Sequence, residues 1–113
     1  MSWDVVFTEP NKTMGTKEKV RESLLVACEQ ITGRKIPRRG PTEVSINDSF
    51  CYEVLFIGHK RAIESLTLAF KISKGDPHAE PDHPARSFIR QVSNHTGWEA
   101  IDTYTNTAIT DRG

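Results

Sequence analysis

The sequence predicts an α+β fold in which one mainly antiparallel sheet carries two helices on one face. Strand-like runs and helix-like periodic segments follow each other in the order β-α-β-β-β-α-β. Three of the strand-like runs are consecutive and joined by short links, which is typical of an antiparallel meander. Each helix-like segment has a single apolar stripe, so both helices can bury that stripe against the same face of the sheet.

The first two elements are a strand and the clearest helix of the chain. The strand covers residues 3–8 and stops before Pro10, because proline cannot extend the hydrogen-bond ladder. The helix is bounded by Thr16, a residue type favoured at the N-cap, and Gly33, a residue type favoured after the last turn. Its apolar stripe is formed by Val20, Leu24, Ala27, Cys28 and Ile31. Cys28 is therefore expected to be a small buried hydrophobe.

The meander is predicted over residues 43–46, 50–57 and 63–72, with links at 47–49 and 58–61. Alternate residues of a strand point to opposite faces of the sheet. In the second strand the aromatic positions share one face, and in the third strand the apolar positions do. These two faces should form the core side together: Phe50, Tyr52, Val54, Phe56, Leu66, Leu68, Phe70 and Ile72. Leu55 and Ile57 are then expected on the face that contacts water.

The last third of the chain is predicted as a loop, a helix, a strand and a tail. The loop ends near Pro84, where a helix is expected to begin with Asp82 or His83 at its cap. The core-facing positions of this helix are Ala85, Phe88, Ile89 and Val92, and Gly97 stops it. A strand follows at residues 98–103. The tail at 104–113 carries little signal and is expected to fray, within a single domain of 113 residues.

Composition narrows the class of protein. The 15 basic and 15 acidic side chains balance, which removes the global argument for nucleic acid or for an acidic membrane surface. No apolar stretch approaches the roughly 20 residues that span a bilayer. The first residues resemble no signal peptide, and two cysteines do not make a disulfide framework. We therefore expect a cytoplasmic protein with no membrane contact.

The loop before the second helix holds the side chains that are best suited to catalysis or metal binding. Its histidines and carboxylates are of the types that bind metals, but their spacing matches no established metal site. The prolines of the loop favour an extended path that separates alternate side chains. We expect a structural or partner-binding loop, with a small metal-dependent enzyme as the alternative. The residues concerned are Asp76, His78, Glu80, Asp82 and His83.

A second cluster is basic and lies between the first helix and the meander: Arg34, Lys35, Arg38 and Arg39. Proteins that bind single strands usually interleave basic and aromatic residues, and no aromatic residue occurs from 31 to 49. A solvated loop is therefore expected. Contact with an acidic protein and binding of RNA are the alternatives. The seven glycines are scattered and form no phosphate-binding loop, and no catalytic residue, metal or cofactor is predicted.

The outer face of the meander carries the most informative feature of the sequence. Leu55 and Ile57 should lie together on it, with Ala69 as a neighbour on the adjoining strand. Apolar residues that cluster on an open sheet often mark an interface. Alternatively, the tail or an N-terminal segment could cover them.

Several segments resemble small bacterial α+β proteins related to immunity proteins of contact-dependent and other polymorphic toxin systems. The likeness covers the opening WDVVF at 3–7, the paired strands at 50–56 and 66–72, and the closing TGWEAIDT at 96–103. It implies a protein that binds and neutralises a toxin domain, and it assigns no catalytic residue. The stretches at 34–40 and 76–84 depart from the pattern, in loops where partner specificity is expected to vary.

These observations together predict a non-catalytic protein-binding module, most plausibly an immunity protein for a cognate toxin domain. The contact is expected to use Leu55 and Ile57, the loop at 76–83, or both. The main alternative is a homodimeric structural or regulatory module that buries the same sheet face against a second copy.

Overall fold

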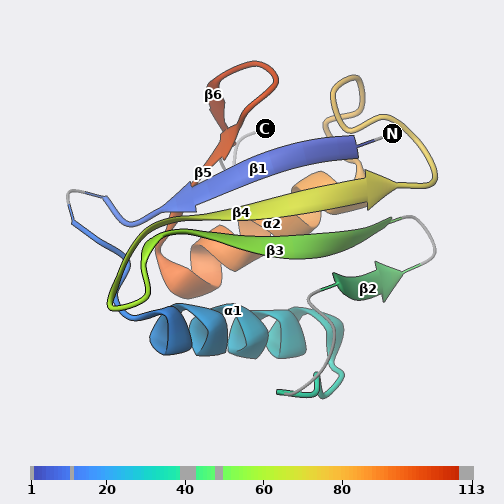
Figure 1. The fold of residues 1–113 in the computed structure, drawn as a ribbon. Coiled ribbons are helices and arrows are strands. Elements are labelled where there is room, and N and C mark those ends of the chain that lie inside the picture. The colour runs from blue at the N-terminus through green and yellow to red at the C-terminus, as the bar shows by residue number, and fades with distance from the viewer. Residues whose placement is uncertain (1, 11, 39–42, 48–49, 110–113) are drawn as a thin grey trace.

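The computed structural model describes residues 2–10, 12–38, 43–47 and 50–109, and for 43–47 only the backbone is considered. Two helices and one antiparallel sheet confirm the predicted α+β class (Figure 1). The elements are β1 (Ser2–Thr8), α1 (Lys17–Thr32), β2 (Glu43–Asn47), β3 (Phe50–His59), β4 (Ala62–Ile72), α2 (Pro84–Thr96), β5 (Glu99–Asp102) and β6 (Thr107–Ile109).

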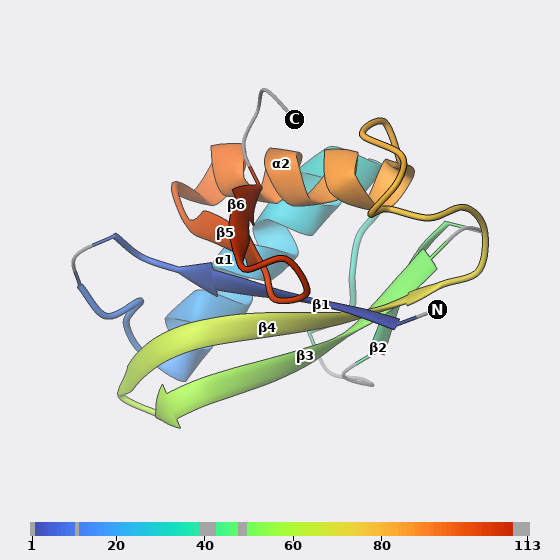
Figure 2. The same cartoon turned by 90° about the horizontal axis from the view of Figure 1, so that it is seen from above.

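The strands lie in the order β2-β3-β4-β1-β5-β6, and every neighbouring pair is antiparallel. The predicted meander is present as β2-β3-β4. The first strand of the chain lies between β4 and β5, a position that local sequence patterns cannot specify. Both helices pack on the same side of this sheet, as Figure 2 shows from above.

The C-terminal segment differs from the prediction, because residues 107–109 form the sixth strand instead of a frayed tail. The turn before it is closed by hydrogen bonds from Tyr104 N to Asp102 Oδ1 (2.8 Å) and from Asn106 N to Asp102 O (2.7 Å). Asn106 has φ 56°, a left-handed conformation that asparagine tolerates. Ile109 is 6% exposed and packs into the core, which anchors the strand. Residues 110–113 lie outside the described part of the chain.

The helix ends follow their predicted capping residues. The hydroxyl of Thr16 accepts a hydrogen bond from Lys19 N, and Gly33 is left-handed at the C-terminal end of α1. The cap of α2 is His83, one of the two candidates, and its Nδ1 accepts a hydrogen bond from Ala85 N at 3.0 Å. These local bonds set where each helix begins relative to the sheet.

The β3–β4 hairpin is tighter than predicted. Both strands extend into the expected link, β3 to His59 and β4 from Ala62, and a bulge follows Ile57. Gly58 at the bulge has φ +113°, and a Cβ on it would lie 2.8 Å from the backbone nitrogen of Glu64. Only glycine fits there without a shift in the backbone.

The core between sheet and helices is built around Phe70. Its ring centroid lies 5.7 to 6.3 Å from the ring centroids of four other buried aromatic residues: Trp3, Phe50, Tyr52 and Phe88. All the core-side positions predicted for β4 and α2 are buried. In β3, by contrast, burial decreases from Phe50 toward Phe56.

Cys28 of α1 meets Tyr52 of β3 inside this core. The Cys28 Sγ and Tyr52 Oη atoms are 2.9 Å apart, and both residues are fully buried. Burial raises the pKa of the Cys28 thiol to about 11 and raises the pKa of the Tyr52 phenol. Both groups therefore stay protonated in the folded chain at neutral pH, and Cys28 is a buried structural residue as predicted.

Candidate functional site

The sheet face opposite the helices carries a row of side chains that crosses five strands. Leu55 pairs with Thr67, Thr67 with Val6, Val6 with Ile101, and Ile101 with Ala108. Residues paired across antiparallel strands point to the same face. Because Leu68, Val5 and Ala100 are buried against the helices, their neighbours in this row face outward. We call these five residues the central row; four of them are apolar.

Leu55 and Ile57 stay accessible on this face. Each side chain is 49% exposed, so the described part of the chain does not bury them. The alternative that the tail or an N-terminal segment covers them finds no support in residues 2–8 and 107–109, which are strands of the sheet itself. The outer face is therefore an open surface with two large aliphatic side chains near its β3 edge.

Ala69, which the sequence predicts as their neighbour, is the next outward-facing residue of β4 after Thr67, on the side away from Ile57. It pairs with Glu53 on one side and with Asp4 on the other, whereas Thr67 stands directly opposite Leu55. The central row is consequently flanked by a row with two exposed carboxylates. We call Glu53, Ala69 and Asp4 the acidic row.

The loop between β4 and α2 is bonded to itself. Asp76 Oδ1 accepts from His78 N at 2.9 Å, and the carboxylate of Glu80 accepts from Asp76 N. His83 is 3% exposed; its Nε2 donates to the carbonyl oxygen of Lys74 at 2.7 Å while Nδ1 caps α2. Asp82 is exposed. In this structure both ring nitrogens of His83 form hydrogen bonds, and His83 therefore links the loop to the start of α2.

The structure does not bring this loop together with Leu55 and Ile57. The loop follows Ile72, which pairs with Phe50, and Leu55 lies five residues further along β3. That separation corresponds to roughly 17 Å along the strand. The two predicted contact regions are thus at different places on the molecule, and of these two regions the sheet face is the one that presents large exposed aliphatic groups.

Sequence reasoning missed a buried carboxylate that faces the loop. Asp102 of β5 is 1% exposed; its Oδ2 lies 3.4 Å from His78 Nδ1 and 3.8 Å from an Arg86 Nη. The Arg86 guanidinium lies over the ring of Trp3, and its Nε donates to the Pro77 carbonyl. The sequence did hold a sign of this buried carboxylate: in β5, Asp102 occupies a position that alternation with Ala100 assigns to the core-facing side.

The cluster around Asp102 joins three segments distant in sequence. A histidine whose ring nitrogen faces a buried carboxylate can act as a general base. Here the imidazole of His78 is packed between the rings of Trp3 (5.6 Å between centroids) and Tyr104 (4.5 Å). Its evident role is to pack the loop, α2 and the β5–β6 turn together.

One residue of the predicted basic cluster, Arg38, is neutralised by carboxylates. Arg38 donates to the carboxylates of Glu22 (3.0 Å) and Glu29 (2.9 Å) of α1 and to the Ile36 carbonyl. Arg34 and Lys35 are exposed, and Arg39 lies outside the described residues. The side-chain hydrogen bonds from Arg38, followed by the Ile36 backbone N–H, lower the pKa of Glu29 to about 2. Arg38 therefore adds no free charge to a nucleic-acid surface.

We predict that Arg38→Ala raises the pKa of Glu29 toward its usual value. In the native chain this lowered pKa gives stability that is fully present above the unfolded value of 4.5 and is lost as the pH falls toward about 2. The variant should lack that component, so its stability should change less over this pH range. Carboxyl-detected NMR titration of Glu29 and urea unfolding across the range measure both effects. An unchanged titration of Glu29 would contradict the prediction. The variant Arg38→Lys measures how much of the lowering of the Glu29 pKa depends on the two-pronged hydrogen bonding of the guanidinium group.

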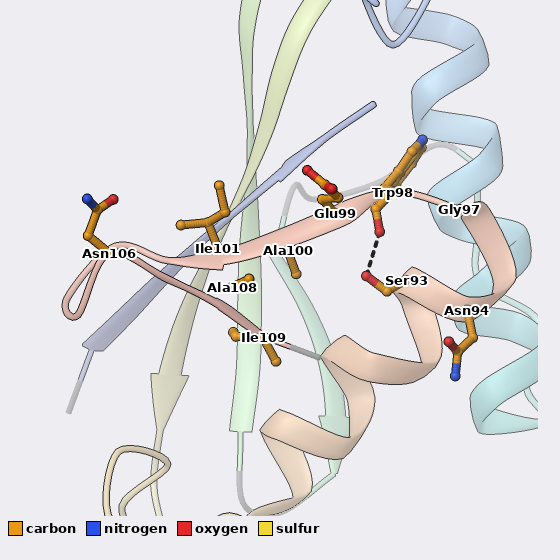
Figure 3. Close-up of a pocket in the computed structure, with 10 residues that line it drawn as sticks. All are labelled: Ser93, Asn94, Gly97, Trp98, Glu99, Ala100, Ile101, Asn106, Ala108 and Ile109. Atoms are coloured by element: carbon orange, nitrogen blue, oxygen red, sulfur yellow. Dashed lines mark hydrogen bonds between the residues drawn. The ribbon is translucent and has the colours of Figure 1, made fainter. Parts of the chain in front are cut away.

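A shallow cavity of about 420 Å³ lies where β5 and β6 meet the end of α2 (Figure 3). Trp98, Ala100 and Ile109 supply apolar lining, and Ser93 Oγ donates to the Trp98 carbonyl at 2.6 Å. Among the described lining residues, Glu99 has the one titratable side chain. That lining provides no pairing of a nucleophile with a base.

A search of residues 2–10, 12–38, 43–47 and 50–109 finds no group of three or more His, Cys, Asp or Glu side chains placed to hold a metal ion. Neither of the two described helices is long and apolar enough to cross a membrane.

Comparison with protein-family models, curated proteins and solved structures finds no match to this chain.

Proposed function

We propose that this chain is a non-catalytic protein-binding module whose open sheet face receives a second protein. We further propose that this second protein is a toxin domain, which the chain neutralises as an immunity protein by covering its active site or substrate surface. The observation that carries the proposal is the half-exposure of Leu55 and Ile57 on the sheet face away from both helices.

Leu55 and Ile57 each keep about half of their surface exposed in the free chain. Completing the burial of a half-exposed leucine or isoleucine contributes about 1 kcal/mol. Val6, Ile101 and Ala108 extend the apolar surface across the sheet, as the strand register shows. A partner that covers the central row buries apolar side chains on both sides of Thr67, and apolar residues that gather on one face often mark an interface.

The rigidity of the face adds to the argument. Each residue of the central row is on a strand of the sheet, and β4, β1 and β5 have a neighbour on both sides, whereas Leu55 lies beyond the part of β3 that pairs with β2. A partner therefore meets a surface that needs little ordering on binding, which lowers the entropic cost of association. The toxin-neutralising role is proposed from the sequence alone, from the resemblance of segments 3–7, 50–56, 66–72 and 96–103 to immunity-related proteins.

The test is co-expression with the protein encoded by the adjacent gene, followed by co-purification and titration calorimetry. We expect a complex, and we expect the double variant Leu55→Asp/Ile57→Asp to weaken it by about 100-fold, which corresponds to about 2.7 kcal/mol. The matched control is Val26→Asp, because Val26 is also an exposed aliphatic residue (39%) but lies on α1. It should leave the affinity unchanged.

Two results would count against the proposal. One is the lack of any complex at micromolar concentration, which rejects this partner. The other is a complex that tolerates Leu55→Asp/Ile57→Asp as well as it tolerates Val26→Asp, which rejects the sheet face as the contact. Circular dichroism of each variant verifies that the fold is kept.

A further inference from the structure

Acidic side chains outnumber basic ones on the open sheet face. Register and burial place four charged residues at outward positions of β1, β3, β4 and β5. Three are acidic (Asp4, Glu53 and Glu99), and one, Lys71, is basic. A chain whose total charge is zero thus concentrates negative charge on the surface that holds its exposed aliphatic residues.

The three carboxylates flank the central row on both sides. Asp4 and Glu53 belong to the acidic row, and Glu99 pairs with Thr8, two residues along β1 from Val6 on the other side. All three residues are exposed, and within residues 2–10, 12–38 and 50–109 none of them forms an ion pair. Their charge is consequently available to a molecule that docks there.

The two ends of the face differ as well. Lys60 and Arg61 form the turn beyond Ile57, and the Lys60 carbonyl accepts from Lys17 N of α1. Lys60 and Arg61 therefore place positive charge at the hairpin end, Lys71 places one at the other end of β4, and the carboxylates lie along β1, β5 and the middle of β3.

From this arrangement, and resting on the protein-binding function proposed above, we infer that the partner presents a basic surface. Lysine or arginine side chains surround an apolar centre on it, and they meet Asp4, Glu53 and Glu99. A second copy that pairs face to face with its two-fold axis along the strands brings one acidic row against the other, and like charges at an interface are unfavourable. Charge complementarity also accelerates encounter and makes binding sensitive to salt.

The inference can be tested without the natural partner. The probe is a displayed library of a small helical domain whose surface positions are randomised among Lys, Glu, Leu, Ser and Tyr. Binders are selected on the native chain, with Leu55→Asp/Ile57→Asp as the counter-target, so that the enriched domains are those that need the aliphatic side chains. We expect enrichment of lysine over glutamate together with leucine or tyrosine.

Charge reversal then tests the carboxylates directly. For an enriched domain, Asp4→Lys/Glu53→Lys should weaken binding by about tenfold at low salt, and added salt should reduce that difference. The control is Glu18→Lys/Glu64→Lys, which changes the net charge equally at two exposed acidic residues on α1 and at the β4 bulge. It should have less than a third of the effect.

The possible failures are distinguishable. Binders that need Leu55 and Ile57 but are neutral or acidic would overturn the inferred basic partner and leave the docking face standing. If no enriched domain depends on Leu55 and Ile57, or none is enriched at all, both the docking face and the inferred partner fail.

Discussion

Replacing Phe70 by alanine is expected to lower the free energy of unfolding by about 4 kcal/mol, because the change removes a fully buried ring and leaves a cavity. The Phe70 side chain is 0% exposed and contacts aromatic rings from β1, β3 and α2. Its loss therefore loosens the sheet and the helix layer together. Urea unfolding followed by tryptophan fluorescence measures the change.

The control for this prediction is Phe56→Ala, on the same sheet face near the end of β3. Phe56 is partly exposed, so its truncation should cost about half as much or less. If Phe70→Ala does not fold, Phe70→Leu keeps most of the volume and should show a smaller loss of stability. Equal costs for Phe70→Ala and Phe56→Ala would show that the core is not centred on Phe70.

Replacing Asp102 by alanine is expected to cost about 3 kcal/mol, because it removes a buried hydrogen-bond acceptor and leaves the partly buried Arg86 guanidinium without its counter-charge. The change takes the carboxylate away from Arg86 and His78 and removes the acceptor for Tyr104 N. The loop before α2 and the β5–β6 turn should both loosen. Denaturant unfolding measures the global cost, and amide hydrogen exchange of the two segments measures the local one.

Two further variants separate the contribution of the Asp102 charge from that of its hydrogen bond and provide a control. Asp102→Asn keeps the acceptor for Tyr104 N but removes the negative charge, so its cost should lie between zero and that of Asp102→Ala. Asp82→Ala removes an exposed loop carboxylate and should change stability by about 0.5 kcal/mol or less. Should Asp102→Ala prove as harmless as Asp82→Ala, the buried carboxylate does not hold these segments together.

Local signals predicted most of the fold. Thr16, Gly33, His83 and Gly97 end the helices where their capping chemistry indicates, because a cap depends on neighbouring residues alone. The alternation in β3 and β4 predicted which face is buried, since a strand has a period of two. β6 was missed because three residues are too few for a periodic signal, and its order comes from the Asp102 turn and from burial of Ile109.

The candidate site divides in the same way. Leu55 and Ile57 could be placed on the outer face from β3 and β4 alone. The position of β1 between β4 and β5 could not be predicted in this way. That position adds Val6 and Ile101 to the central row and Asp4 to the acidic row. The basic loop is expected from the sequence to be solvated, and the structure adds that Arg38 folds back onto two glutamates of α1.

The sequence by itself therefore determined the class of fold, the ends of the helices and the presence of misplaced aliphatic residues on β3, because each follows from periodicity or from a short-range hydrogen bond. Only the tertiary structure decided the order of the strands, the neighbours of Asp102 and the joining of apolar and acidic residues from four or more strands into one surface. Those features depend on contacts between residues as far apart as Asp4 and Thr103, and no local pattern encodes such pairs.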